Sequence, residues 1–242
     1  MRGAALGAAL GAALGAFGSW IGFALPKLPD GKTSALARKR WLLLPRWQHV
    51  LADCAGALEE CQAADLVPGQ VDSQSQEVRR DHILTLTQSR QAQRKFPHLL
   101  RICDKLEELA YALQTDPAIS GRFEPTLARY DPGGFYLPHL DTNGTDDRSL
   151  TAICYLNPSW SLEDGGCLRL FTEEGPQDIC PELGSVVLFS SELLHEVRPL
   201  ALSAGPRWAL SLWFTTSQTS SGRQDVSDWD LDDGPLLATL DD

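Results

Sequence analysis

The sequence lacks the features that mark nucleic-acid-binding proteins and nucleotide-phosphate sites. Its formal net charge is −11, and no basic cluster is interleaved with aromatic residues, so it offers no favourable surface to a polyanion. The repeat GAALGAALGAALGA over residues 3–16 is rich in glycine, but it contains no lysine and follows no predicted strand, unlike a phosphate-binding loop. We therefore expect no nucleic-acid partner.

Zinc-binding spacing is also absent. None of the cysteines forms a Cys-x-x-Cys pair, which argues against a structural zinc site. The six cysteines are Cys54, Cys61, Cys103, Cys154, Cys167 and Cys180. Cys54 and Cys61 share one face of a predicted helix, which is typical of core packing. An even number of cysteines permits disulfides, but a chain of this size does not require them.

The N-terminal segment, residues 3–25, contains no charged side chain and consists mostly of Ala, Gly, Leu and Phe. Its length suits a secretory signal, a signal-anchor helix or an organellar leader, and its glycine content also suits a disordered leader. We expect a location in the secretory pathway, a membrane or an organelle, with a cytoplasmic location left open. Membrane association through residues 3–25 follows from the anchor interpretation. Residues 1–40 are excluded from the predicted fold.

Residues 41–216 are predicted to form one mainly β domain with flanking α-helices. Apolar residues recur at helical spacing over residues 45–62 and 97–114. From about residue 120 to 216, short β-forming segments alternate with turns such as Asp164-Gly165-Gly166. This pattern predicts a double-stranded β-helix, or jelly-roll, core rather than alternating β and α units. The remaining residues, 217–242, are predicted to be an acidic tail.

His139 and Asp141 stand two residues apart at the end of a predicted strand that begins near Phe135. Because side chains alternate along a strand, both point to the same face. His195, which follows another predicted strand, supplies a third ligand. Two histidines and one carboxylate form the facial triad of non-haem Fe(II) oxygenases, which leaves further coordination positions open. The other histidines have no partner at ligand spacing and are expected to be structural or exposed: His49, His82 and His98.

The last predicted strand, residues 207–214, carries an arginine on a face that we expect to point inward. Its period of two places on one face Arg207, Ala209, Ser211 and Trp213. An inward-facing arginine needs a partner, because an unpaired buried cation is costly. A dicarboxylate co-substrate provides one, since a guanidinium binds a carboxylate through two parallel hydrogen bonds. A salt bridge at the end of the strand is the alternative.

Several separated blocks, in order, resemble the Fe(II)/2-oxoglutarate-dependent dioxygenases of the prolyl 4-hydroxylase superfamily, and among them the hypoxia-inducible-factor-type prolyl hydroxylases. The blocks are HLD (139–141), RSLTAICYLNPSW (148–160), DGGCLRLF (164–171), HEV (195–197) and RWALSLWF (207–214). Residues 71–86, VDSQSQEVRRDHILTL, are similar to a segment that forms a mobile hairpin over the substrate in this family. The resemblance covers about residues 45–215.

The resemblance implies a role for each matching residue. The implied iron ligands are His139, Asp141 and His195. The implied co-substrate-binding residues are Arg207 and Tyr155, which contact the far carboxylate of 2-oxoglutarate, and Tyr130. The implied substrate-binding residues are Arg79 and Asp81, a charged pair of the mobile hairpin, and Trp213, which lines the site.

The resemblance also implies a reaction, the hydroxylation of a prolyl residue in a protein or peptide. It is coupled to decarboxylation of 2-oxoglutarate to succinate and CO₂. Fe(II), 2-oxoglutarate and O₂ are the implied cofactor and co-substrates, with ascorbate as the reductant. Two alternatives stay open, a 2-oxoglutarate oxygenase of a free small molecule and a non-catalytic jelly-roll binding module.

Overall fold

The computed structural model of the protein describes residues 36, 39–69, 78–113, 115, 118–142 and 146–216. The predicted leader at residues 3–25, residues 71–77 of the predicted hairpin and the predicted acidic tail at residues 217–242 lie outside the described residues. Within the part that is described, no helix is both long enough and apolar enough to cross a membrane.

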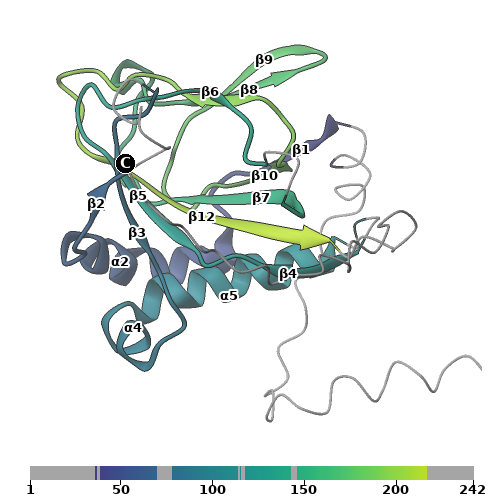
Figure 1. Cartoon of the computed structure of the whole chain (residues 1–242). Helices are drawn as coiled ribbons and strands as arrows, with labels where there is room; N and C mark the ends of the chain where they lie inside the picture. Colours follow the sequence, from purple (N-terminus) through teal and green to yellow (C-terminus); the bar gives the residue numbers. More distant parts are fainter. Residues whose placement is uncertain are drawn as a thin grey trace, which may run out of the picture.

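Two antiparallel sheets face each other across the middle of the molecule (Figure 1). The larger sheet has the order β1-β10-β7-β12-β5-β3-β2, and β4 also pairs with β12. Its strands are β1 (Trp41–Leu44), β2 (Val67–Pro68), β3 (His82–Thr85), β4 (Ile119–Arg122), β5 (Thr126–Tyr130), β7 (Arg148–Tyr155), β10 (Val186–Ser190) and β12 (Arg207–Thr216). The smaller sheet has the order β6-β11-β8-β9. Its strands are β6 (Tyr136–His139), β8 (Leu168–Thr172), β9 (Gly175–Ile179) and β11 (His195–Val197).

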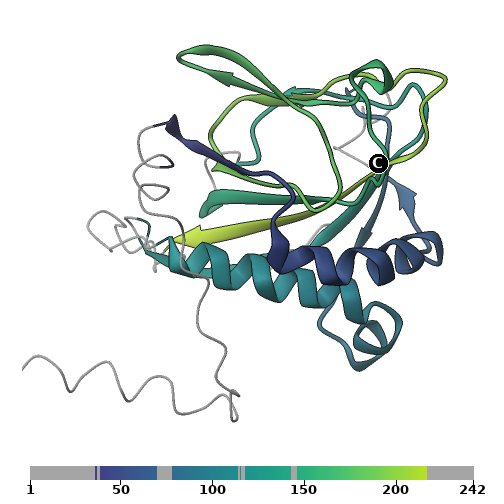
Figure 2. The same ribbon diagram turned by 180° about the vertical axis from the view of Figure 1, so that it is seen from behind.

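Helices cover the face of the larger sheet that points away from the smaller one, as both views show (Figures 1 and 2). They are α2 (Gln48–Gln62), α4 (Arg90–Lys95) and α5 (Pro97–Ala112), and a short 3-10 helix, η2 (Leu162–Asp164), precedes β8. Apolar periodicity predicted a start at residue 45, but α2 begins at Gln48. The reason is that β1 ends at Leu44 and Arg46 adopts a left-handed backbone with φ of 43°.

The central strands of the larger sheet lie between two apolar cores, because their side chains point alternately to one face and to the other. On β7, Leu150, Ala152 and Cys154 pack in the core against the helices. Ile153 and Tyr155, one residue out of step, pack toward the smaller sheet. β10 and β12 divide their side chains between the same two cores. The mainly β jelly-roll fold with flanking helices, predicted from the sequence, is confirmed.

The packed domain begins before the predicted boundary at residue 41. Leu36 is buried in the core against the helices. Arg40 is paired with β10, since its Nη2 donates to Ser190 Oγ at 3.0 Å and its carbonyl accepts from the Ser190 N–H at 2.9 Å. These contacts anchor the entry to β1, the edge strand next to β10.

A carboxylate from α2 caps the first turn of α5. Glu60 is buried, and its two oxygens accept from the backbone N–H groups of His98 and Leu99, each at 2.8 Å. The N-cap residue of α5, Phe96, has no side chain that accepts such a bond. A helix N-terminus has free N–H donors and a partial positive charge, so a carboxylate there satisfies both. Glu60 thereby ties the two covering helices together.

Replacing Glu60 by Ala is expected to lower the free energy of unfolding by about 2 kcal/mol, because two helix N–H groups lose a charged acceptor. Glu60→Gln keeps a neutral acceptor and should lose less. Urea denaturation of the full chain measures both changes. Glu59→Ala, an exposed position on the same helix, is the control and should stay within about 0.5 kcal/mol. An equal loss in Glu59→Ala would contradict the capping role.

Candidate metal and co-substrate site

Three potential metal ligands meet at the smaller sheet. His139 ends β6, His195 begins β11, and the two are directly opposite each other in the antiparallel register. Asp141 follows His139 by two residues, and its backbone N–H donates to the carbonyl of Ser191 at 3.0 Å. One ligand atom from each of the three residues lies within 4.8 Å of the others. Strand pairing thus brings together residues that are far apart in the sequence.

The two imidazoles present the same ring nitrogen to the cluster. Nδ1 of His139 lies 2.8 Å from the carbonyl oxygen of Leu137, and Nδ1 of His195 lies 2.8 Å from that of Leu193. A carbonyl oxygen only accepts, so each Nδ1 carries a proton and Nε2 is the nitrogen that faces Asp141. These Nε2 atoms lie 3.9 Å and 3.6 Å from the two carboxylate oxygens of Asp141. Metal-binding histidines are held in the same way, by a bond from the other nitrogen.

Burial keeps His139 in its neutral form. Loss of hydration and the neighbouring His195 lower the pKa of His139 to about 4, against the opposing effect of Asp141. Because this pKa lies below neutral pH, the imidazole is uncharged at pH 7 and free to act as a ligand. Two imidazole nitrogens and one carboxylate form a donor set that fits Fe(II).

Asp141 is held in place by neighbours from β7 and from the segment that follows β10. Thr151 on β7 donates its hydroxyl to Asp141 Oδ2 at 2.7 Å, and that hydroxyl also lies 3.0 Å from Ser191 Oγ. Thr151 and Ser191 are both buried. Arg148 donates from Nη1 to the Asp141 carbonyl at 2.9 Å. One carboxylate oxygen is thus oriented by a hydrogen bond inside the protein.

A stack of side chains supports the outer side of His139. The ring of Tyr136 lies parallel to the imidazole, with the centroids 3.5 Å apart and 14° between the planes. The guanidinium of Arg79 lies 4.4 Å from the centre of the Tyr136 ring. Asp81 is buried and accepts from Arg79 Nε at 2.7 Å. The charged pair predicted at Arg79 and Asp81 therefore lies next to the metal cluster, with Tyr136 between them.

A cavity of about 290 Å³ adjoins the cluster between the two sheets. Of the residues predicted for the site, those that line it are Arg79, Tyr130, His139, Asp141, His195, Arg207 and Trp213. The face predicted for β12 is confirmed, because Arg207, Ser211 and Trp213 all line the cavity and Ala209 packs between the sheets. Tyr155 and Asp81 lie behind the lining, each in contact with an arginine that belongs to it.

Arg207 is the largest of the fully buried side chains, with 1% of its surface exposed. Its Nε donates to the Gly166 carbonyl at 2.8 Å, and its Cζ lies 5.1 Å from the ring centres of both Tyr130 and Tyr155. Within the described ranges, no carboxylate pairs with Arg207. Nor does the buried hydroxyl of Tyr155 find a hydrogen-bond partner there. A buried cation and a buried hydroxyl thus lie side by side, both incompletely satisfied by the protein.

Burial also decides the protonation of the two tyrosines. It raises the pKa of Tyr130 and of Tyr155 above the usual range, and the opposing effect of Arg207 is smaller. Both hydroxyls are therefore protonated at neutral pH, so each is a hydrogen-bond donor as well as an acceptor. Arg207 and Tyr155 together offer donors to an anion, which suits the far carboxylate of a dicarboxylic acid.

The predicted substrate residue Trp213 lies on the cavity wall beside an arginine. The guanidinium of Arg148 lies 5.3 Å from the centre of the Trp213 ring and 4.5 Å from that of Phe123. The Trp213 indole N–H is buried, and it has no hydrogen-bond partner among the described residues. This wall thus presents an aromatic face and an unused donor.

The sequence analysis missed the residues that orient the cluster, namely Tyr136, Thr151 and Ser191. The strand pattern contained a signal for Thr151, because period two places it on the same face as Tyr155. No local pattern indicated that Tyr136 stacks on His139 or that Ser191 approaches Asp141. These contacts depend on how strands distant in the sequence pair with each other.

Residues 125–215 match the family described as the 2OG-Fe(II) oxygenase superfamily. The matched span contains His139, Asp141, His195 and Arg207. This match supports the resemblance to the 2OG-Fe(II) oxygenases found from the sequence. In the name of this superfamily, Fe(II) is the metal and 2OG stands for the co-substrate 2-oxoglutarate. The donor set and the buried arginine described above fit both groups.

Similar proteins of this superfamily include hydroxylases. A PKHD-type hydroxylase from Shewanella sp. (strain MR-7) is 28% identical over 149 residues, which are 58% of this chain and 65% of that protein. The chain thus spans 65% of the length of this relative. A Pseudomonas putida prolyl-4-hydroxylase structure is 27% identical, with a TM-score of 0.61 over 77% of this chain and 98% of the other.

A more distant structure shares the fold. It is a prolyl hydroxylase from Trichoplax adhaerens, in complex with a peptide fragment of the hypoxia inducible factor oxygen degradation domain. It is 23% identical, with a TM-score of 0.64 over 76% of this chain and 87% of that one. The two chains therefore share the fold described above.

Replacing Thr151 by Val is expected to weaken Fe(II) binding about tenfold, because residues that hold a metal ligand typically contribute that much to affinity. Anaerobic titration of the full chain with Fe(II) measures the change. Thr126→Val is the matched control, since Thr126 lines the same cavity from β5. Equal dissociation constants for Thr151→Val and the native chain would show that the hydroxyl does not orient Asp141.

Proposed function

We propose that the chain is an Fe(II)- and 2-oxoglutarate-dependent dioxygenase that hydroxylates a prolyl residue in a peptide or protein. Carbon dioxide and succinate would be the products from 2-oxoglutarate. One observation carries the proposal: a single cavity is lined both by a His-Asp-His cluster and by a buried arginine without a carboxylate partner among the described residues.

Arg207 would hold the far carboxylate of 2-oxoglutarate. Its Nε is used by the Gly166 carbonyl, which fixes the plane of the guanidinium. An anion that enters the cavity would supply the counter-charge that burial requires. Tyr155 would donate its otherwise unpaired hydroxyl to the same carboxylate, and Tyr130 would pack on the other side of Arg207.

His139, Asp141 and His195 would hold the iron on one face. The chemistry that Fe(II) would supply when bound is the activation of O₂, with 2-oxoglutarate as the source of electrons. Ascorbate would reduce oxidised iron back to Fe(II). The protein's own contribution is position and exclusion of water. Thr151 orients Asp141, the two backbone carbonyls orient the imidazoles, and Ile153 and Leu168 add apolar walls beside the cluster.

The substrate would approach over the strand that carries His139. Leu137 and Leu140 flank this histidine and are 45% and 49% exposed, which offers apolar contact to an extended chain. Arg79, backed by Asp81, and Trp213 lie on the cavity wall beside it. The likeness to a 27% identical prolyl-4-hydroxylase supports a prolyl residue as the target.

Replacing Tyr155 by Phe is expected to raise the KM for 2-oxoglutarate about tenfold, the effect of one hydrogen bond to a charged group. The free energy of unfolding should stay equal or rise slightly, because the lost hydroxyl has no protein partner within the described ranges. Succinate kinetics and urea denaturation measure the two effects. Tyr111→Phe, on an exposed part of α5, is the control. If Tyr155→Phe instead lowers the free energy of unfolding and leaves the KM for 2-oxoglutarate unchanged, the hydroxyl has a structural role.

The activity itself is tested by succinate release from the full chain with Fe(II), ascorbate and 2-oxoglutarate, with and without a library of proline-containing peptides. We expect release that rises with certain peptides, and hydroxyproline in those peptides by mass spectrometry. His139→Ala should abolish turnover because the iron loses a ligand. His49→Ala, an exposed histidine outside the cluster, should retain it.

Other outcomes of this assay separate the alternatives. Succinate release stimulated by small molecules but by no peptide would indicate an oxygenase of metabolites. Absence of Fe(II) binding and of turnover would indicate a non-catalytic jelly-roll module.

A further inference from the structure

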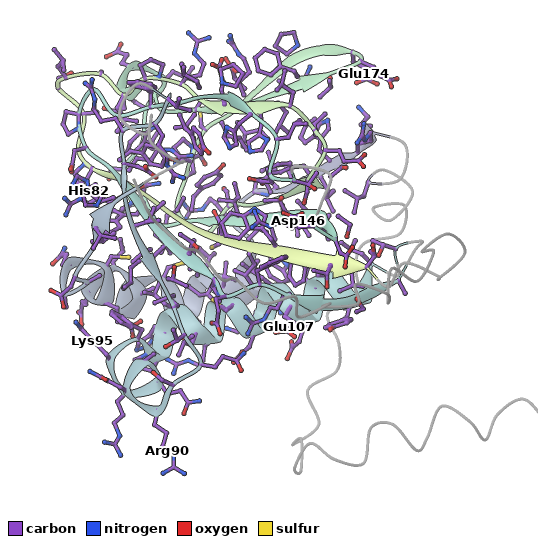
Figure 3. All side chains as sticks on the ribbon, viewed as in Figure 1. His82, Arg90, Lys95, Glu107, Asp146 and Glu174 are labelled. Carbon is purple, nitrogen blue, oxygen red and sulfur yellow. The ribbon has the colours of Figure 1, made fainter. Side chains whose placement is uncertain are left out.

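Two of the six cysteines lie within reach of each other. Cys167 precedes β8, Cys180 follows β9, and their sulfur atoms are 3.5 Å apart. The pairing of Leu168 with Ile179 in the β8–β9 hairpin, continued by one residue, sets the two cysteines opposite each other. The hairpin lies at the edge of the smaller sheet, with Glu174 labelled near its tip (Figure 3).

This arrangement suits a cross-strand disulfide. A disulfide bond is about 2.05 Å long, so the sulfurs need to approach by about 1.5 Å. Side-chain rotation and a small shift of one strand supply such a movement. The other four cysteines are buried in the core against the helices and have no partner cysteine in a hydrogen-bonded pair among the described residues. Those thiols are shielded from oxidants.

Cys167 is held on the inner side of the pair. Its carbonyl accepts from the Arg198 N–H at 3.0 Å, and the preceding Gly166 donates to the Pro199 carbonyl at 3.1 Å. Gly166 is also confined by Leu200 and Arg207, since a Cβ there would meet Leu200 Cδ1 at 2.8 Å and Arg207 Cδ at 3.2 Å. The backbone before Cys167 is therefore clamped.

Cys180 is the more exposed cysteine of the pair. It follows β9, an edge strand that pairs with β8 alone among the described strands, and its side chain is partly exposed, whereas that of Cys167 is buried. An oxidant therefore reaches Cys180 first.

We propose that Cys167 and Cys180 are a reversible oxidation site that forms a disulfide and fastens β9 to β8. The oxidant is a peroxide. Cys180 Sγ attacks hydrogen peroxide and breaks the O–O bond, which gives a sulfenic acid and water. Cys167 Sγ then displaces the hydroxyl from Cys180 as water, with loss of the thiol proton. Two thiols and one peroxide thus give one disulfide and two waters.

The disulfide fastens the hairpin and leaves the arginine site undisturbed. Because Gly166 is held by its bond to Pro199 and by Leu200, we expect the carbonyl that accepts from Arg207 to keep its place. The melting temperature should therefore rise on oxidation, since the link removes freedom from the unfolded chain. Binding of 2-oxoglutarate should change less than twofold. The disulfide itself does not depend on the proposed function.

The test treats the full chain with hydrogen peroxide, blocks remaining thiols by alkylation and analyses digests by mass spectrometry. We expect a peptide pair linked between Cys167 and Cys180, reversed by dithiothreitol, and slower hydrogen exchange in β9. Cys180→Ser and Cys167→Ser should each abolish the link and the rise in melting temperature. Cys54→Ser is the matched control, because serine can keep the bond that the Cys54 thiol donates to the Val50 carbonyl.

Several results would overturn the proposal. Over-oxidation of Cys180 without a linked peptide would show that Cys167 does not resolve the sulfenic acid. A link between other cysteines, or one that survives in Cys180→Ser, would assign the chemistry elsewhere. A disulfide-linked protein with an unchanged melting temperature would show that the link does not fasten β9 to β8. If the linked protein binds 2-oxoglutarate more than twofold more weakly by calorimetry, the link disturbs the arginine site. Loss of succinate release in the reduced chain would bear on the proposed function and not on this site.

Discussion

The site depends on the alternation of side chains along β7 and β12, the two paired strands at the centre of the larger sheet. One face of each strand packs against α2 and α5, and the other faces the smaller sheet. A slip of one residue would exchange the faces, so that Leu150 would enter the cavity and Thr151 would enter the apolar core. The helices therefore do more than cover the sheet, because their apolar core holds the polar face in register.

This arrangement explains how the protein tolerates polar groups at its centre. Arg207, the Tyr155 hydroxyl and the Trp213 indole N–H are buried without full satisfaction among the described residues. Each such group costs stability, and the apolar packing on the other side of the sheet offsets that cost. These three groups line or adjoin one cavity, which is where a ligand would complete them.

The three candidate metal ligands are oriented by hydrogen bonds within the protein. His139 and His195 use the same local device, a bond from Nδ1 to the carbonyl of the residue two positions earlier. This contact arises within each strand segment, so it orients each ring independently of the other. Pairing of β6 with β11 then brings the two rings together, and Thr151 from the opposite sheet orients the carboxylate. The cluster thus joins both sheets.

Much of the fold and part of the candidate site could be predicted from the sequence, because their signals are local. Turns and short β-forming segments indicated the jelly-roll core, and period two placed His139 with Asp141 and Arg207 with Trp213 on shared faces. The start of α2 was predicted too early, because apolar spacing does not register a left-handed residue such as Arg46.

The sequence by itself thus determined which residues alternate inward and which chemical groups were available for a site. Only the tertiary structure decided which of those groups meet. The stack of Arg79 and Tyr136 on His139, the bond from Thr151 to Asp141 and the approach of Cys167 to Cys180 all depend on strand register. Register is a property of two segments at once, settled by the packing of the whole sheet, so no single stretch of sequence contains it.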